Sequence, residues 1–439
     1  MDNSPWLKFD RPSFLSLSGD VDSDIAIIGG GIAGVSTLYF LLKNTNKKVV
    51  LLEKNKIASG ATGHNAGFAV NSMEAVTQEL IKEFGKEKVK NGFSELRSAW
   101  DLLEKIIKDC GMDEINFVPD GGLVYTTIES FWGGIEEEMV DDEIGRGAWK
   151  YLLAAEFAPN DIDEKYKKYL EVIPQDDILR KLRIIDKGCV GAAIPKNDYI
   201  KKARVNSGEL CYKIISFLKK NYSDRFEVFE QANISEIKIG DGAILYSGEN
   251  VIRVEKVVLC TNAYNDFKVI INDREDDRLK KLGRSVGYMV AYDNNDKDFL
   301  TVLVFDERKN ITNVPYFYYH KVSKNGKALA VVGGPEKELS IGEEYDWQEE
   351  SKVNVDNVYN EFLERTFGES VPKFDYHWNG MMAYTPNHAR WVGKDPKSDS
   401  LLYNLGCNGI GLLQSIMGGA KIARIINDET LASSMFDLQ

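Results

Sequence analysis

Residues 24–36 read DIAIIGGGIAGVS, in which a short apolar run leads into three glycines and then into a second apolar run. The run IAII at residues 25–28 predicts a buried strand, and the apolar residues that continue to about Lys43 predict a helix. The next apolar run, VVLLE, predicts a second strand that ends at Glu53. Strand, glycine loop, helix and strand together indicate a compact βαβ unit.

The glycines of this loop predict a dinucleotide-binding site. Gly29, Gly31 and Gly34 fit GxGxxG, in which the first glycine permits a tight turn, the second admits a pyrophosphate and the third lets the helix pack on the strand. The helix N-terminus then offers free N–H groups and a partial positive charge to the phosphates. Glu53, nineteen residues after Gly34, can accept a hydrogen bond from a ribose 2′-hydroxyl and would repel a 2′-phosphate. The alternative is an ordinary βαβ turn.

The composition is that of a folded, acidic protein. At ~150 residues per domain, the chain of 439 residues suggests roughly two or three structural units. Hydrophobic residues make up 43% and charged residues 28%, which predicts a packed core rather than disorder. The formal net charge is −13 and no long basic run occurs, so we expect no nucleic-acid partner.

The cysteines and histidines are too scattered to suggest a disulfide framework or a metal site. The five cysteines are an odd number and no two lie close together, which also argues against a paired-cysteine zinc site. The four histidines form no cluster, so we expect no metal. No signal peptide and no stretch of ~18 apolar residues is visible, so we expect no membrane association and a reducing, cytoplasmic location.

The rest of the chain alternates between helical and strand-like segments. Residues 74–110 have a helical pattern, and Asn206 with Glu209 forms a capping-box pattern before another amphipathic helix. Residues 283–334 contain four segments of strand-like alternation, and residues 401–426 predict a strand, a glycine turn and a helix. This order suggests two interleaved domains rather than two successive ones.

Three further blocks make the pattern more specific. They are LLEKNKIASGATGHNAG at 51–67, VVLCTNAYN at 257–265, and WNGMMAYTPNHARWVG at 378–393 with NLGCNGIGLL at 404–413. With these blocks in this order, the chain resembles the FAD-dependent amine and amino-acid oxidoreductases of the D-amino-acid oxidase superfamily, which includes γ-glutamylputrescine oxidase, sarcosine oxidase and dimethylglycine dehydrogenase. The resemblance extends from about residue 5 to about residue 430.

The resemblance implies an α/β fold with two interleaved domains. One is a Rossmann-like FAD-binding domain, and the other is an α+β substrate domain built on a mainly antiparallel sheet. We expect the FAD-binding domain to comprise residues 20–75, 186–265 and 373–430. The substrate domain would then comprise residues 76–185 and 266–372.

The resemblance also implies which residues contact FAD. The expected contacts come from the glycine loop, the second block, the third block and a strand at 231–234 that would lie near the adenine. They are Gly29, Gly31, Ile32, Ala33, Gly34, Glu53, Lys54, Gly60, Ala61, Thr62, His64, Asn65, Ala66, Gly67, Ile234, Thr261, Asn262 and Ala263. Thr62 would add a hydroxyl to the pyrophosphate site, and Asn65, Ala66 and Gly67 would lie against the isoalloxazine ring.

The last block is expected to contact the flavin through a glycine turn. The residues concerned are Gly380, Gly406, Asn408, Gly409, Ile410 and Gly411. Reduced flavin carries negative charge near N1 and the C2 carbonyl, and the N-terminus of the helix that begins near Leu412 would stabilise that charge. The alternative is that these glycines serve only to make a tight turn.

His64 has two possible roles. Gly60, Thr62, His64 and Gly67 fit G-x-T-x-H-x-x-G. In the related dimethylglycine and sarcosine dehydrogenases, the histidine of that pattern is joined covalently to the flavin 8α-methyl carbon. His64 is therefore either a covalent tether for FAD or a hydrogen-bond donor to the pyrophosphate.

The substrate side is expected around residues 316–322, YFYYHKV. Relatives that bind carboxylates often carry an arginine near the end of this strand, where this chain has His320. This departure leaves room for an amine, and we take His320 and Tyr318 as candidate catalytic residues, with core packing as the alternative for each tyrosine.

The activity implied by the resemblance is oxidation of a C–N bond. A hydride would pass from a small amine or amino acid to flavin N5, the imine would hydrolyse, and dioxygen or another electron acceptor would take the electrons. The alternative is a flavoprotein subunit of a multi-protein oxidase or dehydrogenase that passes electrons to a partner.

Overall fold

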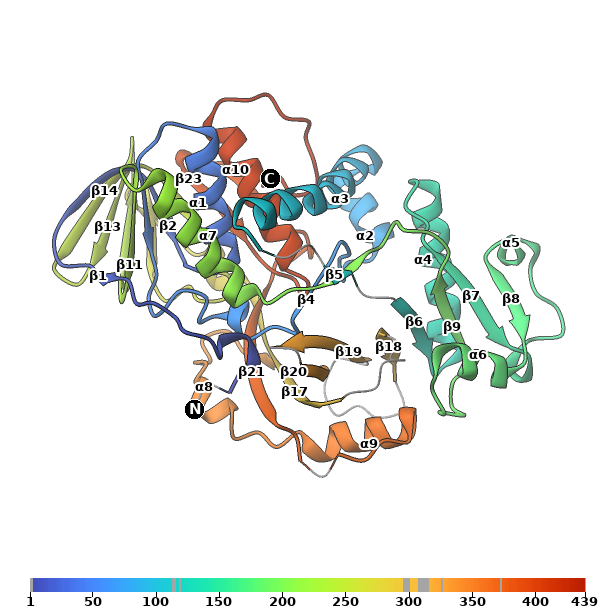
Figure 1. Cartoon of the computed structure of the whole chain (residues 1–439). Coiled ribbons are helices and arrows are strands. Elements are labelled where there is room, and N and C mark those ends of the chain that lie inside the picture. The colour runs from blue at the N-terminus through green and yellow to red at the C-terminus, as the bar shows by residue number, and fades with distance from the viewer. Residues whose placement is uncertain are drawn as a thin grey trace.

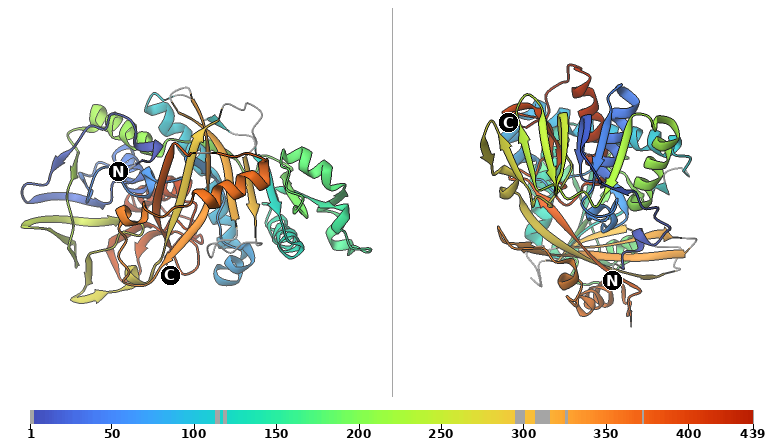
Figure 2. Two further views of the ribbon diagram at one scale, coloured as in Figure 1. Left: turned by 90° about the horizontal axis from the view of Figure 1, so that it is seen from below. Right: turned by 90° about the vertical axis from the view of Figure 1, so that its left-hand side faces the viewer.

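The computed structural model describes residues 3–112, 116–117, 120–294, 301–306, 316–324, 327–371 and 373–438. Two large sheets lie one above the other, and helices cover their outer faces (Figure 1; Figure 2, right). The first sheet has eleven strands and a parallel centre, and the second has nine strands and is mainly antiparallel. This architecture confirms the predicted fold class.

The glycine loop and the strands on either side of it lie at the centre of the first sheet. β2 (Val21–Ile28), α1 (Ile32–Asn44) and β3 (Val49–Leu52) make the expected βαβ unit. β2 and β3 run parallel with Ile25 beside Val49. The last four residues of β2 and all of β3 are buried, as expected for strands covered on both faces.

The remaining strands extend this sheet on both sides. The order is β1-β11-β3-β2-β14-β13-β12-β15-β16, and β23 pairs with both β14 and β22. Their bounds are β1 (Leu15–Ser16), β11 (Phe226–Glu230), β14 (Asn250–Leu259), β13 (Ala243–Ser247), β12 (Glu236–Ile239), β15 (Lys268–Ile271), β16 (Arg274–Asp276), β22 (Trp391–Asp395) and β23 (Ser398–Leu405). β14 is long enough to pair with β13 near its start and with β23 near its end.

Four helices cover one face of the first sheet (Figure 1). They are α1, α3 (Lys86–Asp109), α7 (Ser207–Tyr222) and α10 (Leu412–Ile426). α1 is central and packs against α7 and α10, so its residues from Ile32 to Leu42 are all buried. The Asn206 side chain accepts a hydrogen bond from the Glu209 N–H and caps α7, as the capping pattern predicted.

The predicted helical segment at 74–110 is two helices. α2 (Thr77–Phe84) ends and α3 begins at Gly85, whose backbone has φ +83° and ψ 151°. This conformation is open almost only to glycine, so Gly85 breaks the helical path although the apolar pattern continues through it.

The second sheet has the order β21-β17-β20-β19-β18-β6-β9-β7-β8. All neighbouring pairs are antiparallel except β18 with β6 and β7 with β8. The strands are β21 (Tyr376–Tyr384), β17 (Gly283–Asp293), β20 (Lys327–Leu339), β19 (Tyr316–Lys324), β18 (Thr301–Phe305), β6 (Asp120–Tyr125), β9 (Gly191–Pro195), β7 (Trp149–Ala154) and β8 (Leu170–Ile173). The four strand-like segments predicted between residues 283 and 334 are β17 to β20, although residues 299–300 and 314–315 of the prediction lie outside the described residues.

Smaller elements connect and cover the two sheets. A three-stranded sheet has the order β4 (Phe68–Val70), β10 (Lys202–Arg204) and β5 (Asn116–Phe117). The other helices are α4 (Ile128–Glu143), α5 (Glu164–Lys167), α6 (Gln175–Leu182), α8 (Trp347–Glu350) and α9 (Asp356–Phe367), with short 3-10 turns η1 (Pro5–Leu7), η2 (Ala61–Gly63), η3 (Ala155–Phe157) and η4 (Arg278–Lys281). α9 packs beneath the second sheet, where Phe362 stacks on Phe317 of β19 with ring centroids 4.6 Å apart (Figure 1).

The points at which the chain changes sheet do not coincide with the expected domain boundaries. β15 and β16 follow residue 266 yet belong to the first sheet, and β21 follows residue 373 yet belongs to the second. β9 likewise lies in the second sheet although it follows residue 186. Membership of a sheet depends on long-range pairing, which local strand patterns do not specify. The division into two interleaved domains stays a prediction.

Candidate active site

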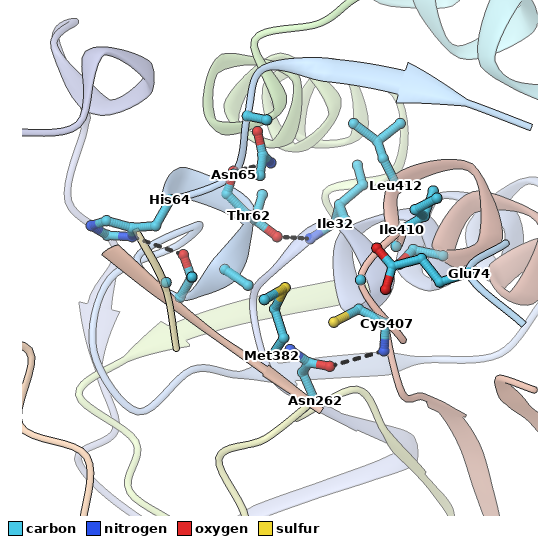
Figure 3. A pocket seen from close by; sticks show the side chains of 18 of the residues that line it. Ile32, Thr62, His64, Asn65, Glu74, Asn262, Met382, Cys407, Ile410 and Leu412 are labelled. Atoms are coloured by element: carbon cyan, nitrogen blue, oxygen red, sulfur yellow. Dashed lines mark hydrogen bonds between the residues drawn. The ribbon is translucent and has the colours of Figure 1, made fainter. Parts of the chain in front are cut away.

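A cavity of about 1240 Å³ lies between the two sheets. On one side it meets the carboxyl ends of the parallel strands, at Ile28, Leu52 and Thr261, where open α/β sheets commonly bind ligands. On the other side it meets β19, β20 and β21 of the second sheet. Figure 3 shows part of its lining, with side chains from both sheets directed toward one space.

Most of the predicted site residues line this cavity. They are Gly29, Gly31, Ile32, Ala33, Glu53, Lys54, Gly60, Ala61, Thr62, His64, Asn65, Ala66, Ile234, Thr261, Asn262, Tyr318, Gly380, Gly409, Ile410 and Gly411. The described lining does not include Gly34, Gly67, Ala263, Gly406, Asn408 or His320.

Several residues outside the lining support it from behind. A Cβ at Gly34 would come within 1.9 Å of the Gly29 carbonyl oxygen, so this glycine allows α1 to pack on β2 as predicted. Gly67 has φ +80° and lies against the Trp6 ring. The Asn408 side-chain oxygen accepts a 2.8 Å bond from the Thr385 N–H and so ties the glycine turn to the end of β21.

Glu53 is held at the glycine loop by two backbone hydrogen bonds. One carboxylate oxygen accepts from the Gly30 N–H at 2.7 Å, and the other accepts from the Asn55 N–H at 2.8 Å. Burial raises the pKa of Glu53, and the two backbone bonds partly oppose that shift. Each carboxylate oxygen has a further lone pair, so the group can still accept a bond from a hydroxyl in the cavity.

Thr62 joins the second block to the start of α1. Its hydroxyl accepts a 2.9 Å bond from the Ile32 N–H, which leaves its own hydrogen to be donated (Figure 3). A Cβ at Gly31 would come within 2.9 Å of the same hydroxyl oxygen, so only glycine permits this approach. Backbone N–H groups, the start of α1 and a hydroxyl donor therefore meet at one place, as an anion site requires.

His64 lies at the end of η2 and lines the cavity. Its ring Nδ1 is 2.9 Å from the Gly60 carbonyl oxygen (Figure 3). Because a carbonyl oxygen only accepts, Nδ1 carries the hydrogen, and the lone pair of the neutral ring is on Nε2. A Cβ at Gly380 would come within 2.6 Å of the His64 carbonyl oxygen, so β21 passes directly over this residue.

The expected strand at residues 231–234 is wrong. The segment is an irregular connection between β11 and β12, because Gln231 has φ +56° and ends the extended path. The Ala232 N–H bonds to the Glu53 carbonyl oxygen at 2.9 Å instead of to a strand neighbour. Ala232, Asn233 and Ile234 nevertheless line the cavity.

The third and fourth blocks meet at the glycine turn before α10. Gly406 has φ +90° and Gly409 has φ +74°, so both adopt the left-handed conformation that glycine favours. The Asn262 side-chain oxygen accepts a 3.1 Å bond from the Cys407 N–H (Figure 3). α10 begins at Leu412, as predicted, and its first turn faces the cavity.

The alternation of β19 decides which aromatic side chains face the cavity. Tyr316 and Tyr318 line it, whereas Phe317 and Tyr319 are buried on the opposite face, toward α9. The Tyr318 ring lies on Gly333, where a Cβ would be only 2.0 Å from its hydroxyl. Tyr318, a candidate catalytic residue, is therefore in reach of a molecule in the cavity.

His320 is placed differently from expectation. It is 2% exposed, and its Nε2 donates to the Ala66 carbonyl oxygen at 2.5 Å. Phe68, which does line the cavity, packs against the imidazole with ring centroids 4.5 Å apart. Burial lowers the pKa of His320 to about 3, so the ring is neutral. This position gives His320 a role in holding the second block and no contact with a molecule in the cavity.

Sequence reasoning missed a pair of carboxylates in the cavity wall. Glu74 follows β4, and Glu336 lies on β20. The Tyr316 hydroxyl is 3.3 Å from a Glu74 carboxylate oxygen and 3.4 Å from a Glu336 carboxylate oxygen. Burial and the neighbouring Glu336 raise the pKa of Glu74 to about 8. No local pattern in the sequence indicates this pair, because contacts between segments far apart in the chain bring the two residues together.

Two negative findings concern the part of the chain that the structure describes. No three of its histidine, cysteine, aspartate and glutamate side chains are grouped so that they could hold a metal ion. None of its helices is both long and apolar enough to cross a membrane.

The fold and the cavity define a dinucleotide-binding protein in which a second sheet closes the cofactor site. A family model described as FAD dependent oxidoreductase, DAO, matches residues 24–425. The chain therefore belongs to the DAO family of FAD-dependent oxidoreductases, and FAD is its cofactor.

Individual relatives are more distant. The chain is 19% identical to γ-glutamylputrescine oxidoreductase of Escherichia coli (strain K12) over 421 residues, which cover 95% of this chain and 86% of that protein. It is 31% identical to a putative Rieske 2Fe-2S iron–sulfur protein of Bacillus subtilis (strain 168) over 121 residues, which are 28% of this chain and 23% of that protein. This match thus spans about a quarter of the Bacillus protein. A crystal structure of glycine oxidase from Geobacillus kaustophilus is similar in fold, with a TM-score of 0.60, 18% identity and coverage of 95% of this chain and 99% of that chain.

The residues around the cavity fit FAD. The glycine loop leaves space that side chains would otherwise fill. The Glu53 carboxylate can still accept a hydrogen bond from a ribose hydroxyl, and the Thr62 hydroxyl can still donate one to a phosphate. When bound, FAD supplies an acceptor for a hydride. The polar groups of the glycine loop and the second block would hold the cofactor, and the second sheet would enclose it.

Proposed function

We propose that this enzyme oxidises a carbon–nitrogen bond of a small amine or amino acid. A hydride would leave the carbon next to nitrogen for flavin N5, and the imine would hydrolyse in water. The observation that carries this proposal is the continuous cavity that runs from the glycine loop to Tyr316 and Tyr318. The names of the Escherichia coli and Geobacillus relatives support the same class of substrate.

The chain's own residues would bind and orient the reactants. Glu53, Lys54 and the loop at Gly60–Thr62 would hold the adenosine and pyrophosphate parts. The N-terminus of α10, with the amides of Gly409 to Gly411, would favour negative charge on the pyrimidine side of the flavin. Tyr316 and Tyr318 would exclude water and hold the substrate over the ring.

The electron acceptor is either dioxygen or another carrier. An iron–sulfur partner is the second candidate, because one relative is described as a putative Rieske protein. In that case the chain would act as the flavoprotein subunit of a larger oxidase or dehydrogenase.

Anaerobic reduction of the purified, FAD-loaded protein tests the proposal. We expect bleaching of the flavin absorbance near 450 nm when the correct member of a panel of amines, N-methyl amino acids and D-amino acids is added. Admission of air then separates the acceptors, because an oxidase regains its colour at once and forms hydrogen peroxide. A flavin that no member of the panel bleaches, but that dithionite does bleach, would contradict the proposed reaction.

A further inference from the structure

Glu74 and Glu336 form a carboxylate pair beside the glycine turn before α10. A Cβ at Gly409 would lie 2.0 Å from a Glu74 carboxylate oxygen, so the carboxylate rests on the bare backbone of this turn (Figure 3). The Ser285 hydroxyl donates to Glu336 at 2.6 Å, and the Tyr384 hydroxyl lies 3.2 Å from the same carboxylate oxygen. Both carboxylates line the cavity: Glu336 is buried, and Glu74 is surrounded by the cavity walls but accessible from within the cavity.

Among the residues that the structure describes, no cationic side chain acts on the pair. In the described part of the chain, the main groups that act on the two carboxylates are the hydroxyls of Ser285, Tyr316 and Tyr384 and other carboxylates. Two neighbouring carboxylates cannot both be ionised at little cost, and the pKa values of both Glu74 and Glu336 are raised.

The lysine and arginine side chains of the described lining are Arg11, Lys54, Lys56, Arg146, Lys202 and Arg390, and none of them acts on the pair. The Arg146 guanidinium is bound to Asp141 and Thr77. The Arg390 guanidinium donates to Asn404 and to the Gly406 carbonyl oxygen and is 3% exposed. Lys202 lies on β10, near His320. The wall around Glu74 and Glu336 is therefore acidic and aromatic, since Tyr316 and Tyr318 stand beside the pair.

We propose that Glu74 and Glu336 bind the cationic nitrogen of the substrate, so that the substrate class is an organic amine rather than a molecule held by its carboxylate. This inference rests on the proposed function, because the cavity and the family indicate where the reaction would occur and which kind of bond is oxidised. The carboxylates then indicate which substrates bind in the cavity. A cation would stabilise the ionised forms of both carboxylates and would lie beside two tyrosine rings. Binding would therefore release a proton.

The pH dependence follows from the groups that face the pair. These are Glu74 itself, Glu336 and Glu338 on β20, Tyr316 and Tyr318 on β19, Tyr384 on β21 and Cys407 in the glycine turn. The pKa values of these three tyrosines and of Cys407 are raised by burial, so the carboxylates are the groups that change charge below pH 9. A cation that cannot itself titrate should bind more tightly as the pH rises through about 8, where Glu74 ionises.

The test is calorimetric titration of the FAD-loaded protein with benzyltrimethylammonium chloride and, separately, with sodium benzoate. These compounds have similar aromatic parts and opposite charges, and neither titrates between pH 6 and pH 9. We expect the cation to bind about tenfold more tightly at pH 9 than at pH 6, and at least about tenfold more tightly than benzoate at pH 9. Buffers of different ionisation enthalpy should report release of a proton when the cation binds at pH 7. Tighter binding of benzoate, or cation binding without pH dependence, would overturn the proposal.

Matched variants locate the effect. Glu74→Gln and Glu336→Gln keep the shape of the pair and remove one charge, so each should weaken cation binding by about tenfold or more and flatten its pH dependence. Glu79→Gln is the control, because Glu79 is an exposed glutamate on α2 outside the cavity lining. Equal flavin content in all three proteins shows that the fold is kept. Unchanged cation binding in both cavity variants would exclude the pair as the recognition site.

The outcomes for substrate class and for reaction are separable. Tight, pH-dependent cation binding in a protein whose flavin no amine bleaches would support the recognition site and contradict the proposed oxidation. Bleaching by amino acids that bind through their carboxylates, with no binding of the cation, would support the oxidation and overturn the recognition site.

Discussion

At the scale of single residues, the site depends on side chains held by backbone carbonyl and N–H groups. His64 bonds to the Gly60 carbonyl oxygen, His320 to the Ala66 carbonyl oxygen, and Glu53 to two backbone N–H groups. Each of these bonds fixes either a tautomer or a carboxylate position before any ligand arrives. The cofactor loop is therefore preorganised by its own polar side chains.

The first prediction concerns a covalent bond between His64 and FAD. Its Nδ1 donates to Gly60, so a neutral ring presents the nucleophilic lone pair on Nε2. If the bond forms, acid precipitation should leave yellow colour and fluorescence in the pellet, and a tryptic peptide containing His64 should carry the mass of the flavin. His64→Ala should release FAD to the supernatant while the fold is kept. A wild-type supernatant that holds all the flavin would show that His64 acts only as a hydrogen-bond donor.

The second prediction concerns acid stability. Burial lowers the pKa of His320 from 6.5 to about 3, so below pH 6.5 the unfolded chain takes up a proton that the folded chain does not. The stability conferred by the neutral ring is fully present above pH 6.5 and is lost as the pH falls toward 3. Between pH 7 and pH 5, this linkage should cost about 2 kcal/mol of the free energy of unfolding.

Urea unfolding of variants at the two pH values isolates this contribution. His320→Asn keeps a donor for Ala66 but does not titrate, so it should lose about 2 kcal/mol less than the wild type between pH 7 and pH 5. His388→Asn is the control, because His388 is exposed and has φ +56°, a conformation that asparagine tolerates. The same pH sensitivity in all three proteins would contradict a buried, neutral His320.

At the scale of elements, the glycine-rich turns were predictable and the strand pairing was not. The loop before α1 and the turn before α10 are local patterns in which glycine spacing reports the backbone conformation directly. The break at Gly85 was missed because the helical pattern continues through it. The segment at 231–234 was misassigned because its strand was expected from the resemblance and not from a pattern of its own. His320 was misplaced because its burial depends on Phe68, which reaches it from a distant part of the chain.

The third prediction concerns the turn before α10. Gly409 has φ +74°, and a Cβ there would collide with the Glu74 carboxylate. Gly409→Val should therefore strain the turn, displace Glu74 and slow reduction of the flavin by substrate by at least about tenfold, while FAD stays bound through the loop before α1. Stopped-flow absorbance under anaerobic conditions measures this rate.

A glycine with free space provides the control for that variant. Gly133 lies within α4, and a Cβ at this position would meet nothing within 4 Å, so Gly133→Ala should leave the reduction rate unchanged. If Gly409→Val also reduces at the wild-type rate, the turn serves only to connect β23 to α10.

At the scale of the whole molecule, the cavity exists because two sheets meet over the second block. β21 of the second sheet contacts η2 of the second block, where Gly380 lies against the backbone of His64. Both segments were predicted from the sequence to belong to the flavin site, whereas the wall between Glu74 and Glu336 was not. That wall joins a loop after β4 to the end of β20, and no local pattern specifies such a contact.

The fourth prediction tests the contact between β21 and η2. A Cβ at Gly380 would lie 2.6 Å from a backbone oxygen, which cannot rotate away as a side chain could. Gly380→Ala should therefore separate the sheets slightly, lower the thermal midpoint by a few degrees and weaken FAD binding. Calorimetry and the ratio of flavin to protein absorbance measure both effects. Gly287→Ala on β17 is the milder comparison, since its Cβ would meet the flexible end of Met382 at 3.2 Å and Glu336 Cγ at 4.0 Å. A larger effect there than at Gly380 would contradict a tight contact at His64.

The pairing of β14 with β23 has a consequence for biosynthesis. β14 lies beside β2 in the centre of the first sheet, yet its other neighbour near the carboxyl end is β23, at residues 398–405. While a ribosome is still making the residues before β23, this edge of β14 has unpaired N–H and carbonyl groups and apolar side chains that α10 has not yet covered. We therefore expect the nascent chain to be prone to association until late in translation, and the flavin site to be complete only after the last of these segments emerges.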